Sequence, residues 1–256
     1  MTEIAAKASA FADLHRPGAP LILNNIWDAG SARSVVKAGA RAVATGSWSL
    51  AGALGFDDGE NAPLDLVLTT VARIVASVDA PVSVDFEGGY AGEPRRVEAH
   101  AARLFATGAI GVNFEDQMVG GDGIYGVDEQ AARIAAVRRA ADAAGAPAFV
   151  NARTDLFLKA PDDAHPDLVD AAIARAAAYA AAGADGFFVP SLIDEASIAK
   201  IVENAPMPVN VMVRDGVPTT ARLAELGVAR VSHGPGPWRA AMDRLADAAA
   251  VALGGA

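Results

Sequence analysis

Cysteine does not occur anywhere in the 256 residues of the chain. Its absence excludes disulfide bonds, structural zinc sites built from thiolates, and catalysis by a cysteine thiol. Hydrophobic residues make up 52% of the sequence and charged residues 20%. This composition and length fit one large α/β domain over residues 1–256 better than two small domains, and no linker-like segment interrupts the chain.

Positive charge is also scarce, with 21 Lys and Arg residues against 31 Asp and Glu and a net charge of -10. Nucleic acids and anionic membranes bind basic surfaces, so this balance argues against either as a partner. A small anionic substrate remains compatible with it, because one local cation can override the charge of the whole protein.

Long apolar runs are missing too. Residues 1–4 lack the basic region and the following apolar run of a signal peptide, and no unbroken apolar stretch is long enough to cross a bilayer. The sequence therefore predicts a cytoplasmic protein.

A repeated pattern is what the sequence does contain: alanine-rich helical sequence, then glycine, then a short apolar run. Clear copies place the glycine at Gly39, Gly108, Gly145, Gly183 and Gly227. Glycine is favoured just after a helix, where the backbone is left-handed, so each copy predicts a helix end that leads into a parallel strand. With the weaker copies included, the expected strands are residues 21–25, 41–45, 82–85, 111–114, 148–151, 186–189, 209–212 and 229–232.

Eight such strand-helix units predict a (β/α)8 TIM barrel, with a helix over residues 2–15 closing its bottom. The alternative is a doubly wound dinucleotide-binding fold, which needs Gly-x-Gly-x-x-Gly after its first strand. This chain has Asn24-Asn25-Ile26-Trp27-Asp28-Ala29-Gly30 there instead. The barrel is therefore favoured.

The third expected strand runs into acidic and glycine-rich sequence, Asp85-Phe86-Glu87-Gly88-Gly89-Tyr90. Two residues apart on an extended chain, Asp85 and Glu87 would point to the same side at the carboxyl end of a buried strand. Acids held together repel each other unless a cation lies between them, and carboxylate oxygens suit Mg²⁺ or Mn²⁺. Asp58 belongs to a second acidic group on the same rim, and Glu115 ends the fourth strand. The alternative is a solvated strand end with ordinary surface acids.

Other groups follow strands on the same mouth. The second strand runs into Thr45-Gly46-Ser47-Trp48-Ser49, whose small residues leave backbone N–H groups free to face an oxyanion. A tight turn is the alternative. The fifth strand ends in Asn151-Ala152-Arg153-Thr154-Asp155, where Arg153 can bind a substrate carboxylate through two hydrogen bonds. A salt bridge to Asp155 or a helix cap is its alternative role.

Histidine occurs at 4 positions. His15, His100 and His165 lie in charge-rich helical or loop sequence and are expected at the surface. His233 follows the eighth strand on the predicted mouth, where a neutral imidazole can polarise or protonate a substrate oxygen. The alternative is that His233 only caps the strand. Asn210, in the seventh strand, is a similar uncharged donor at the rim.

Together these motifs resemble the phosphoenolpyruvate mutase/isocitrate lyase superfamily, from about Asn24 to the end of the eighth strand. Its signature pieces occur in order: Gly46-Ser47-Trp48, Leu54-Gly55-Phe56-Asp57-Asp58, Asp85-Phe86-Glu87-Gly88-Gly89-Tyr90, Phe114-Glu115-Asp116 and Ala152-Arg153-Thr154. Glu87 stands where the family often has aspartate.

The resemblance also implies roles for these residues. Asp85 would bind Mg²⁺ most directly, and three further carboxylates would hold the ion largely through waters: Asp58, Glu87 and Glu115. The backbone N–H groups of Ser47 and Trp48 would bind a carboxylate or enolate oxygen of the substrate. Arg153 would bind another oxygen.

The loop after the fourth strand departs from the family's pattern. Isocitrate and methylisocitrate lyases carry Lys-Lys-Cys-Gly-His there, whose thiol is a general acid, and the mutase has a gate with Lys and Asn. Residues 117–126 read Gln-Met-Val-Gly-Gly-Asp-Gly-Ile-Tyr-Gly, without lysine, cysteine or histidine. The thiol route of proton transfer and the basic gate for phosphoryl chemistry are both missing. The loop is not a P-loop either, and we interpret it as a mobile lid.

A mouth histidine without the lyase gate resembles the oxaloacetate decarboxylase branch of the superfamily. We therefore expect a Mg²⁺-dependent lyase that breaks a C–C bond in a small 2-oxo acid such as oxaloacetate, through a metal-stabilised enolate. Phosphonopyruvate hydrolysis or phosphoenolpyruvate mutase-like chemistry is the alternative reaction. A non-catalytic barrel that binds an organic acid is the alternative of another class.

The C-terminal helix around Pro237-Trp238-Arg239-Ala240-Ala241-Met242 has more small apolar surface than solvent exposure favours. The superfamily exchanges its last helix between barrels. The resemblance therefore implies a homo-oligomer, formed as a dimer of helix-swapped dimers.

Overall fold

The structure is a computed structural model that describes residues 2–145 and 147–254. Its strands form one parallel sheet in the order β1-β8-β7-β6-β5-β4-β3-β2. The strands are β1 (Leu21–Leu23), β2 (Val43–Ala44), β3 (Val82–Asp85), β4 (Gly111–Glu115), β5 (Phe149–Arg153), β6 (Gly186–Val189), β7 (Val209–Met212) and β8 (Arg230–Ser232).

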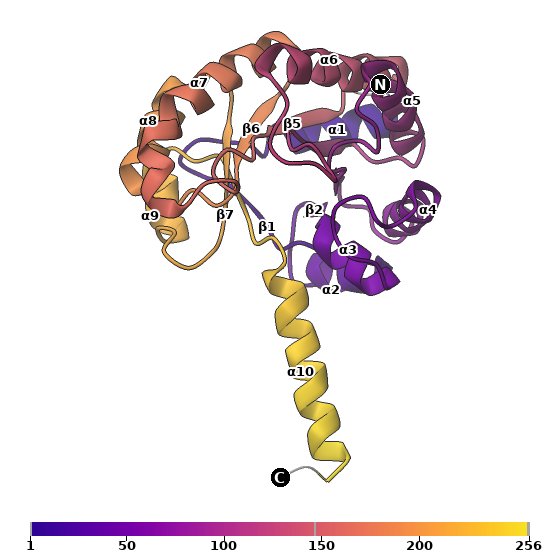
Figure 1. Cartoon of the computed structure of the whole chain (residues 1–256). Coiled ribbons are helices and arrows are strands. Elements are labelled where there is room, and N and C mark those ends of the chain that lie inside the picture. The colour runs from indigo at the N-terminus through magenta and orange to yellow at the C-terminus, as the bar shows by residue number, and fades with distance from the viewer. Residues whose placement is uncertain (1, 146, 255–256) are drawn as a thin grey trace.

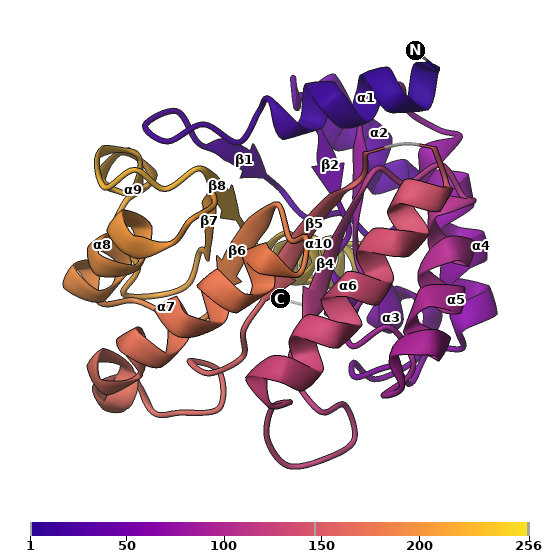
Figure 2. The same ribbon diagram turned by 90° about the horizontal axis from the view of Figure 1, so that it is seen from above.

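Helices surround this sheet, as the view from above shows (Figure 2). They are α1 (Glu3–Ala12), α2 (Ala29–Lys37), α3 (Ser47–Leu54), α4 (Leu64–Val75), α5 (Pro94–Phe105), α6 (Val127–Ala143), the 3-10 turn η1 (Asp162–Ala164), α7 (His165–Ala181), α8 (Glu195–Asn204), α9 (Thr220–Glu225) and α10 (Gly236–Ala252). The outer faces of the strands pack on the apolar faces of these helices, which buries one large core.

The two end strands of this order, β1 and β2, meet through a parallel bridge between Ile26 and Thr45. The Ile26 N–H donates to the Ala44 carbonyl at 2.8 Å, and the Gly46 N–H donates to the Ile26 carbonyl at 3.2 Å. These bonds bring the ends of the sheet together. The predicted (β/α)8 barrel is confirmed.

β1 and β2 are shorter than the sequence predicts, since β1 ends at Leu23 and β2 spans only Val43–Ala44. Near the mouth, hydrogen bonds of the Asn25 side chain add to the bridge between Ile26 and Thr45. Asn25 Oδ1 accepts hydrogen bonds from the backbone N–H groups of His233, at 3.1 Å, and Gly234, at 2.9 Å. Asn25 Nδ2 donates to the Thr45 carbonyl at 2.9 Å. One buried amide thus ties β8, β1 and β2 together beyond their last ladder bonds.

α1 closes the amino-terminal end of the barrel. Thr2 caps the helix, since its hydroxyl accepts the Ala5 N–H at 3.2 Å. Phe11 is fully buried, and its ring meets that of Phe149 edge-on at 5.7 Å between centroids. α1 ends at Ala12, three residues before the predicted boundary.

The prediction that His15, His100 and His165 lie at the surface is wrong for two of them. His15 is 7% exposed and its ring stacks on Phe149 at 4.0 Å. Burial lowers the pKa of His15 to about 3, so its ring is neutral. His165 is 0% exposed, with Nε2 at 2.9 Å from the Phe157 carbonyl. A neutral ring with one bonded nitrogen fits an apolar core, and local charge in the sequence does not reveal it.

α10 leaves the mouth of the barrel and projects away from it (Figure 1). None of its residues is buried, and the exposed fractions of Leu245 and Val251 are 63% and 77%. At its root, Trp238 meets Trp48 edge-on at 5.3 Å between ring centroids, and the Arg239 guanidinium lies 4.5 Å from the Trp48 ring. Among the described residues, no helix has both the length and the apolarity to span a membrane.

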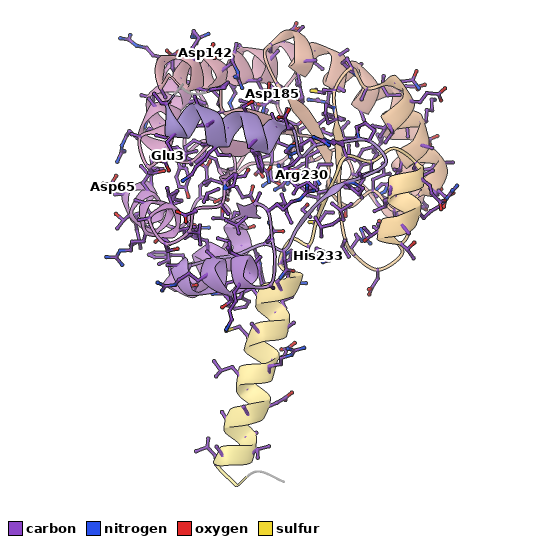
Figure 3. All side chains as sticks on the ribbon, turned by 180° about the vertical axis from the view of Figure 1, so that it is seen from behind. Glu3, Asp65, Asp142, Asp185, Arg230 and His233 are labelled. Carbon is purple, nitrogen blue, oxygen red and sulfur yellow. The ribbon has the colours of Figure 1, made fainter. Side chains whose placement is uncertain are left out.

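The inside of this barrel is polar, where (β/α)8 barrels usually carry branched aliphatic side chains. Asn151 Nδ2 donates to Asn113 Oδ1 at 2.9 Å and to Asn210 Oδ1 at 3.1 Å, which links three strands across the interior. Arg230 is 0% exposed and lies within the body of the barrel (Figure 3). These groups form a buried polar layer beneath the mouth.

Candidate active site

A cavity of about 200 Å³ opens among the carboxyl ends of the strands, where α/β barrels place their sites. We call it the central pocket. It is lined by Asn25, Gly46, Ser47, Trp48, Ser49, Asp58, Asp85, Asn113, Arg153, Leu158, Phe188, Pro190, Met212, Ser232, Gly234 and Pro235. Five residues predicted for the site are in this lining: Ser47, Trp48, Asp58, Asp85 and Arg153.

Asp85 ends β3 at the base of the central pocket. Its Oδ2 accepts the Ser47 N–H at 3.0 Å, and its own N–H donates to the Thr45 hydroxyl at 2.9 Å. Its Oδ1 is buried without a hydrogen-bond partner among the described residues. A buried carboxylate oxygen without a donor is unfavourable, and a bound cation would satisfy it.

Glu87 does not continue the extended strand as predicted. β3 ends at Asp85, and Glu87 has a φ of 51°, in the left-handed region that non-glycine residues rarely adopt. Its Oε2 accepts the Glu60 N–H at 2.8 Å, while the Glu60 carboxylate accepts the Tyr90 N–H at 2.7 Å. Glu87 therefore lies behind the pocket lining, beside Asp85 rather than in line with it.

Acid crowding at this end of the pocket shifts several pKa values. Burial, followed by repulsion from Asp58 and Asp85, raises the pKa of Glu87 to about 8. Asp58 lies on the exposed rim, yet desolvation on its pocket side and repulsion from Asp85 raise its pKa as well. Burial raises the pKa of Glu115 well above its usual range, although Arg153 opposes the shift. The site therefore has unfavourable negative charge that a cation would relieve.

The described residues contain no group of three His, Cys, Asp or Glu side chains placed to surround a metal ion. Mg²⁺, however, usually keeps several waters and binds proteins through only one or two carboxylates. The unpartnered Asp85 Oδ1 and the surrounding acids fit that mode. The water-mediated roles of Asp58, Glu87 and Glu115 remain predictions.

Arg153, at the end of β5, is held on two sides by carboxylates. Its Nε donates to Asp155 Oδ1 at 2.6 Å, and its Nη1 lies 2.8 Å from Glu115 Oε2. Burial opposes its charge, but Asp155 and Glu115 raise the pKa of Arg153 well above the usual value. The salt bridge considered as an alternative role is therefore present, and the same guanidinium also lines the central pocket.

Ser47 and Trp48 begin α3 directly after Gly46, which is the N-cap residue. The N–H groups in the first turn of a helix have no partner inside it and favour anions. The Ser47 N–H is bonded to Asp85, so this group orients the Asp85 carboxylate. The Trp48 side chain is 37% exposed at the rim.

His233 and Asn210 are not in the central pocket. Side chains alternate along β8, and Ser232 lines the pocket, so His233 faces the opposite way. It lines a separate hollow at the root of α10 with Asn24, Arg214 and Arg239, as its position in Figure 3 illustrates. Asn210 is 1% exposed and lies in the polar layer below the mouth rather than at the rim.

Sequence reasoning missed several pocket residues. Asn25 follows β1, and Asn113 lies at an inward position of β4. The two-residue alternation that places Asn113 on the same side as Glu115 could have revealed Asn113. The other missed group is an apolar wall formed by Leu158, Phe188, Pro190 and Met212. No local motif marks this wall, because its residues come from separate strands and loops.

The loop of residues 117–126 forms an ordered turn near the acidic cluster. Gln117 and Ile124 form an antiparallel bridge, and the Tyr125 N–H donates to the Asp116 carbonyl at 2.8 Å. The Tyr125 ring lies 3.9 Å from the guanidinium of buried Arg133. The end of the loop is thus fixed to α6, and its role as a lid stays a prediction.

Comparison with known proteins supports an enzymatic site. The sequence model of the family described as phosphoenolpyruvate phosphomutase matches residues 11–253. A crystal structure from Burkholderia cenocepacia, of a candidate phosphonomutase, is 52% identical, covers 98% of this chain and 100% of its own, and superimposes with a TM-score of 0.94.

Curated relatives cover most of the chain as well. An uncharacterised protein of Mycobacterium tuberculosis is 36% identical over 94% of this chain and 87% of its own length. The 2-methylisocitrate lyase of Escherichia coli is 30% identical over 91% of this chain and 83% of its own length. The family thus contains lyases as well as mutases, and its members are enzymes. The chain belongs to the phosphoenolpyruvate phosphomutase family, within the phosphoenolpyruvate mutase/isocitrate lyase superfamily.

Proposed function

We propose that the protein is a Mg²⁺-dependent lyase that cleaves a C–C bond in a small 2-oxo acid, and that oxaloacetate, which would lose CO₂, fits best. The observation that carries this proposal is the composition of the central pocket. It holds Asp85 with its unpartnered oxygen and the guanidinium of Arg153. It also holds the apolar wall of Leu158, Phe188, Pro190 and Met212, in which Phe188 pairs with Arg153 across β5 and β6.

When bound at Asp85, Mg²⁺ would act as a Lewis acid that draws electrons from the 2-oxo group and stabilises the enolate. Arg153 binds the 1-carboxylate, because it is charged, lines the pocket and is held in place by Glu115 and Asp155. The first turn of α3 offers backbone N–H groups to a substrate oxygen. These contacts leave the 4-carboxylate to face the apolar wall.

The apolar wall favours decarboxylation over phosphoryl transfer. A carboxylate placed against apolar side chains loses solvation that the neutral CO₂ product does not need. A phosphoryl group instead needs cationic donors for the charge on its oxygens. Among the described residues that line the pocket, Arg153 alone carries positive charge, and its assignment to the 1-carboxylate leaves no cationic side chain for a phosphoryl group.

P–C bond chemistry is the second candidate, since the 52% identical structure is described as a candidate phosphonomutase. Oxaloacetate and phosphonopyruvate should therefore be compared as substrates at equal concentration, with Mg²⁺ and with EDTA. Pyruvate formation would be corrected for the spontaneous loss of CO₂ without enzyme. We expect kcat/KM for oxaloacetate to exceed that for phosphonopyruvate and to vanish with EDTA and in Asp85→Asn.

Three other outcomes would overturn the proposal. Faster release of phosphate from phosphonopyruvate would assign the site to P–C hydrolysis, and faster formation of phosphoenolpyruvate would assign it to P–C rearrangement. Saturable binding of oxaloacetate without turnover of either compound would assign the chain to the non-catalytic barrels that bind an organic acid.

We also propose that α10 packs against a second copy of the chain, as a helix-swapped dimer or a tetramer of two such dimers. The support is that α10 leaves the barrel without burying a residue while Leu245 and Val251 stay exposed (Figure 1). Light scattering at micromolar concentration is the test, and a monomer there would contradict the proposal. A cytoplasmic location, without nucleic-acid or membrane partners, remains a prediction from the sequence.

A further inference from the structure

Beneath the central pocket, two buried donors fix the orientation of an amide that lines it. Asn113 is 4% exposed, belongs to the pocket lining, and is paired with Asp85 in the register of β3 and β4. Its Oδ1 accepts hydrogen bonds from Arg230 Nη2 at 3.1 Å and from Asn151 Nδ2 at 2.9 Å. Both donors approach from the polar layer inside the barrel.

Arg230 decides which end of the Asn113 amide faces the interior. The oxygen and nitrogen of an amide are hard to tell apart by shape, so the partners must assign them. A guanidinium carries only donors, and the Asn113 atom that meets it must therefore be the oxygen. Because the two ends of a planar amide diverge, an inward Oδ1 turns Nδ2 toward the pocket.

The burial of Arg230 makes this restraint strong. The side chain is 0% exposed, and its Nε and Nη1 have no partner among the described residues. Burial lowers the pKa of Arg230 to about 9, which leaves it protonated at neutral pH. A buried cation with few acceptors strongly favours the acceptor that it has, so flipping the Asn113 amide would be costly.

We propose that Asn113 donates a hydrogen bond from Nδ2 to an oxygen of the bound 2-oxo acid, and that Arg230 is a positioning residue that holds the amide in this orientation. The identity of the ligand rests on the function proposed above. Because Asn113 lies beside Asp85, its donor serves the oxygens at the metal-binding end of the pocket. The hydrogen bond from Asn113 strengthens as negative charge develops on the 2-oxo oxygen. Because the amide is uncharged, it stabilises that charge without repelling Mg²⁺.

The test is Mg²⁺-dependent binding of oxalate, a planar dianion that mimics a pyruvate enolate, measured by calorimetry on the full-length chain. We expect Asn113→Ala and the equally large Asn113→Asp, which lacks the N–H donor, to weaken oxalate binding by about 10- to 100-fold. Arg230→Met should weaken it similarly. Arg230→Lys should recover part of the loss, because an ammonium group is also only a donor.

Ser83→Ala is the matched control, because Ser83 is 1% exposed in the same interior and its hydroxyl has no partner among the described residues. It should bind oxalate within about twofold of the wild type, since it removes no contact that reaches the pocket. Thermal unfolding of every variant shows whether the barrel is intact. A purely structural role of Arg230 would lower stability without the recovery of binding in the lysine variant.

Wild-type affinity for oxalate in both Asn113 variants would overturn the inference, and so would a wild-type protein that binds no oxalate at millimolar concentration. Equal binding by Arg230→Met and the wild type would overturn the positioning role. A protein that binds oxalate through Asn113 yet never turns over oxaloacetate would count against the proposed reaction alone.

Discussion

Asp85→Asn is the sharpest perturbation of the candidate metal site, because it removes one charge and almost no volume. The bond from the Ser47 N–H to Oδ2, 3.0 Å long in the wild type, can be kept by the amide oxygen of asparagine. The unpartnered Oδ1 is lost as an anionic ligand. We therefore expect the variant to fold normally and to bind Mg²⁺ very weakly.

The size of the effect follows from linkage between binding and unfolding. A ligand that binds only the folded state at 100 times its Kd adds about 2.7 kcal/mol to the free energy of unfolding. For a chain of this length, 1 kcal/mol shifts Tm by roughly 2–4 °C. Saturating Mg²⁺ should thus raise the Tm of the wild type by about 5–10 °C and leave that of Asp85→Asn unchanged.

Without Mg²⁺, the wild type should not be more stable than Asp85→Asn by a wide margin. Burial first, and then repulsion from Asp58 and Asp85, raises the pKa of Glu87 to about 8. Removing the charge of Asp85 relieves part of this repulsion, but it also removes the attraction of Asp85 to Arg153 and to buried Arg230. The two changes oppose each other, so apo Asp85→Asn should unfold within a few degrees of the apo wild type.

Scanning calorimetry over a Mg²⁺ titration measures both effects. Asp57→Asn is the control, since Asp57 is next to Asp58 in the sequence but is exposed and does not line the pocket. It should keep the full Mg²⁺ response. A Mg²⁺ response in Asp85→Asn equal to that of the wild type would refute the metal assignment. A large loss of Tm in the apo variant would show that Asp85 serves the fold instead.

His15→Phe should make the free energy of unfolding less sensitive to a fall in pH. Burial lowers the pKa of His15 from 6.5 to about 3, so the unfolded chain takes up a proton at a higher pH than the folded protein does. Urea denaturation should show the wild type losing about 1.4 kcal/mol per pH unit more than the variant between pH ~6 and ~4, and parallel profiles would contradict this. Asp116→Ala should lower the free energy of unfolding by about 3–5 kcal/mol, because it removes the carboxylate that pairs with buried Arg175. Asp170→Ala, in an exposed ion pair, should change it by less than about 1 kcal/mol, and equal losses in urea would argue against a buried network. His233→Ala should keep kcat for oxaloacetate within about twofold, and a loss of about 10²-fold in steady-state assays would return His233 to the mechanism.

The Glu115-Asp116 pair shows how one short motif divides between the pocket and the core. Glu115 pairs with Arg153 at 2.8 Å beside the pocket. Asp116 points the other way and is 0% exposed, with Oδ1 accepting the Asp155 N–H at 2.8 Å and Oδ2 accepting the Tyr179 hydroxyl at 2.8 Å. Asp155 in turn binds Arg153. The buried partner of the motif therefore helps to hold the guanidinium that lines the central pocket.

The sequence by itself determined the barrel and the strand ends that form its mouth. Both depend on local rules: glycine ends a helix in the left-handed conformation, and parallel strands place their carboxyl ends together. For the same reason Asp85 and Arg153, each the last residue of its strand, lie where the sequence predicts. The end of β1 could not be predicted, because the Asn25 side chain that follows it bonds to partners distant in the sequence.

Only the tertiary structure decided which side chains share the pocket. Glu87 lies outside the pocket lining because its own backbone is left-handed and turns the chain after Asp85. The Glu60 N–H that binds its carboxylate comes from another loop. His233 lies outside the pocket because side chains alternate along β8 and the neighbouring Ser232 faces the interior. The orientation of Asn113 depends on Arg230, which is 117 residues away in the sequence. Local pattern sets which segments form helices and strands, but the hydrogen-bond partners that complete a site come from residues that only the closed barrel brings together.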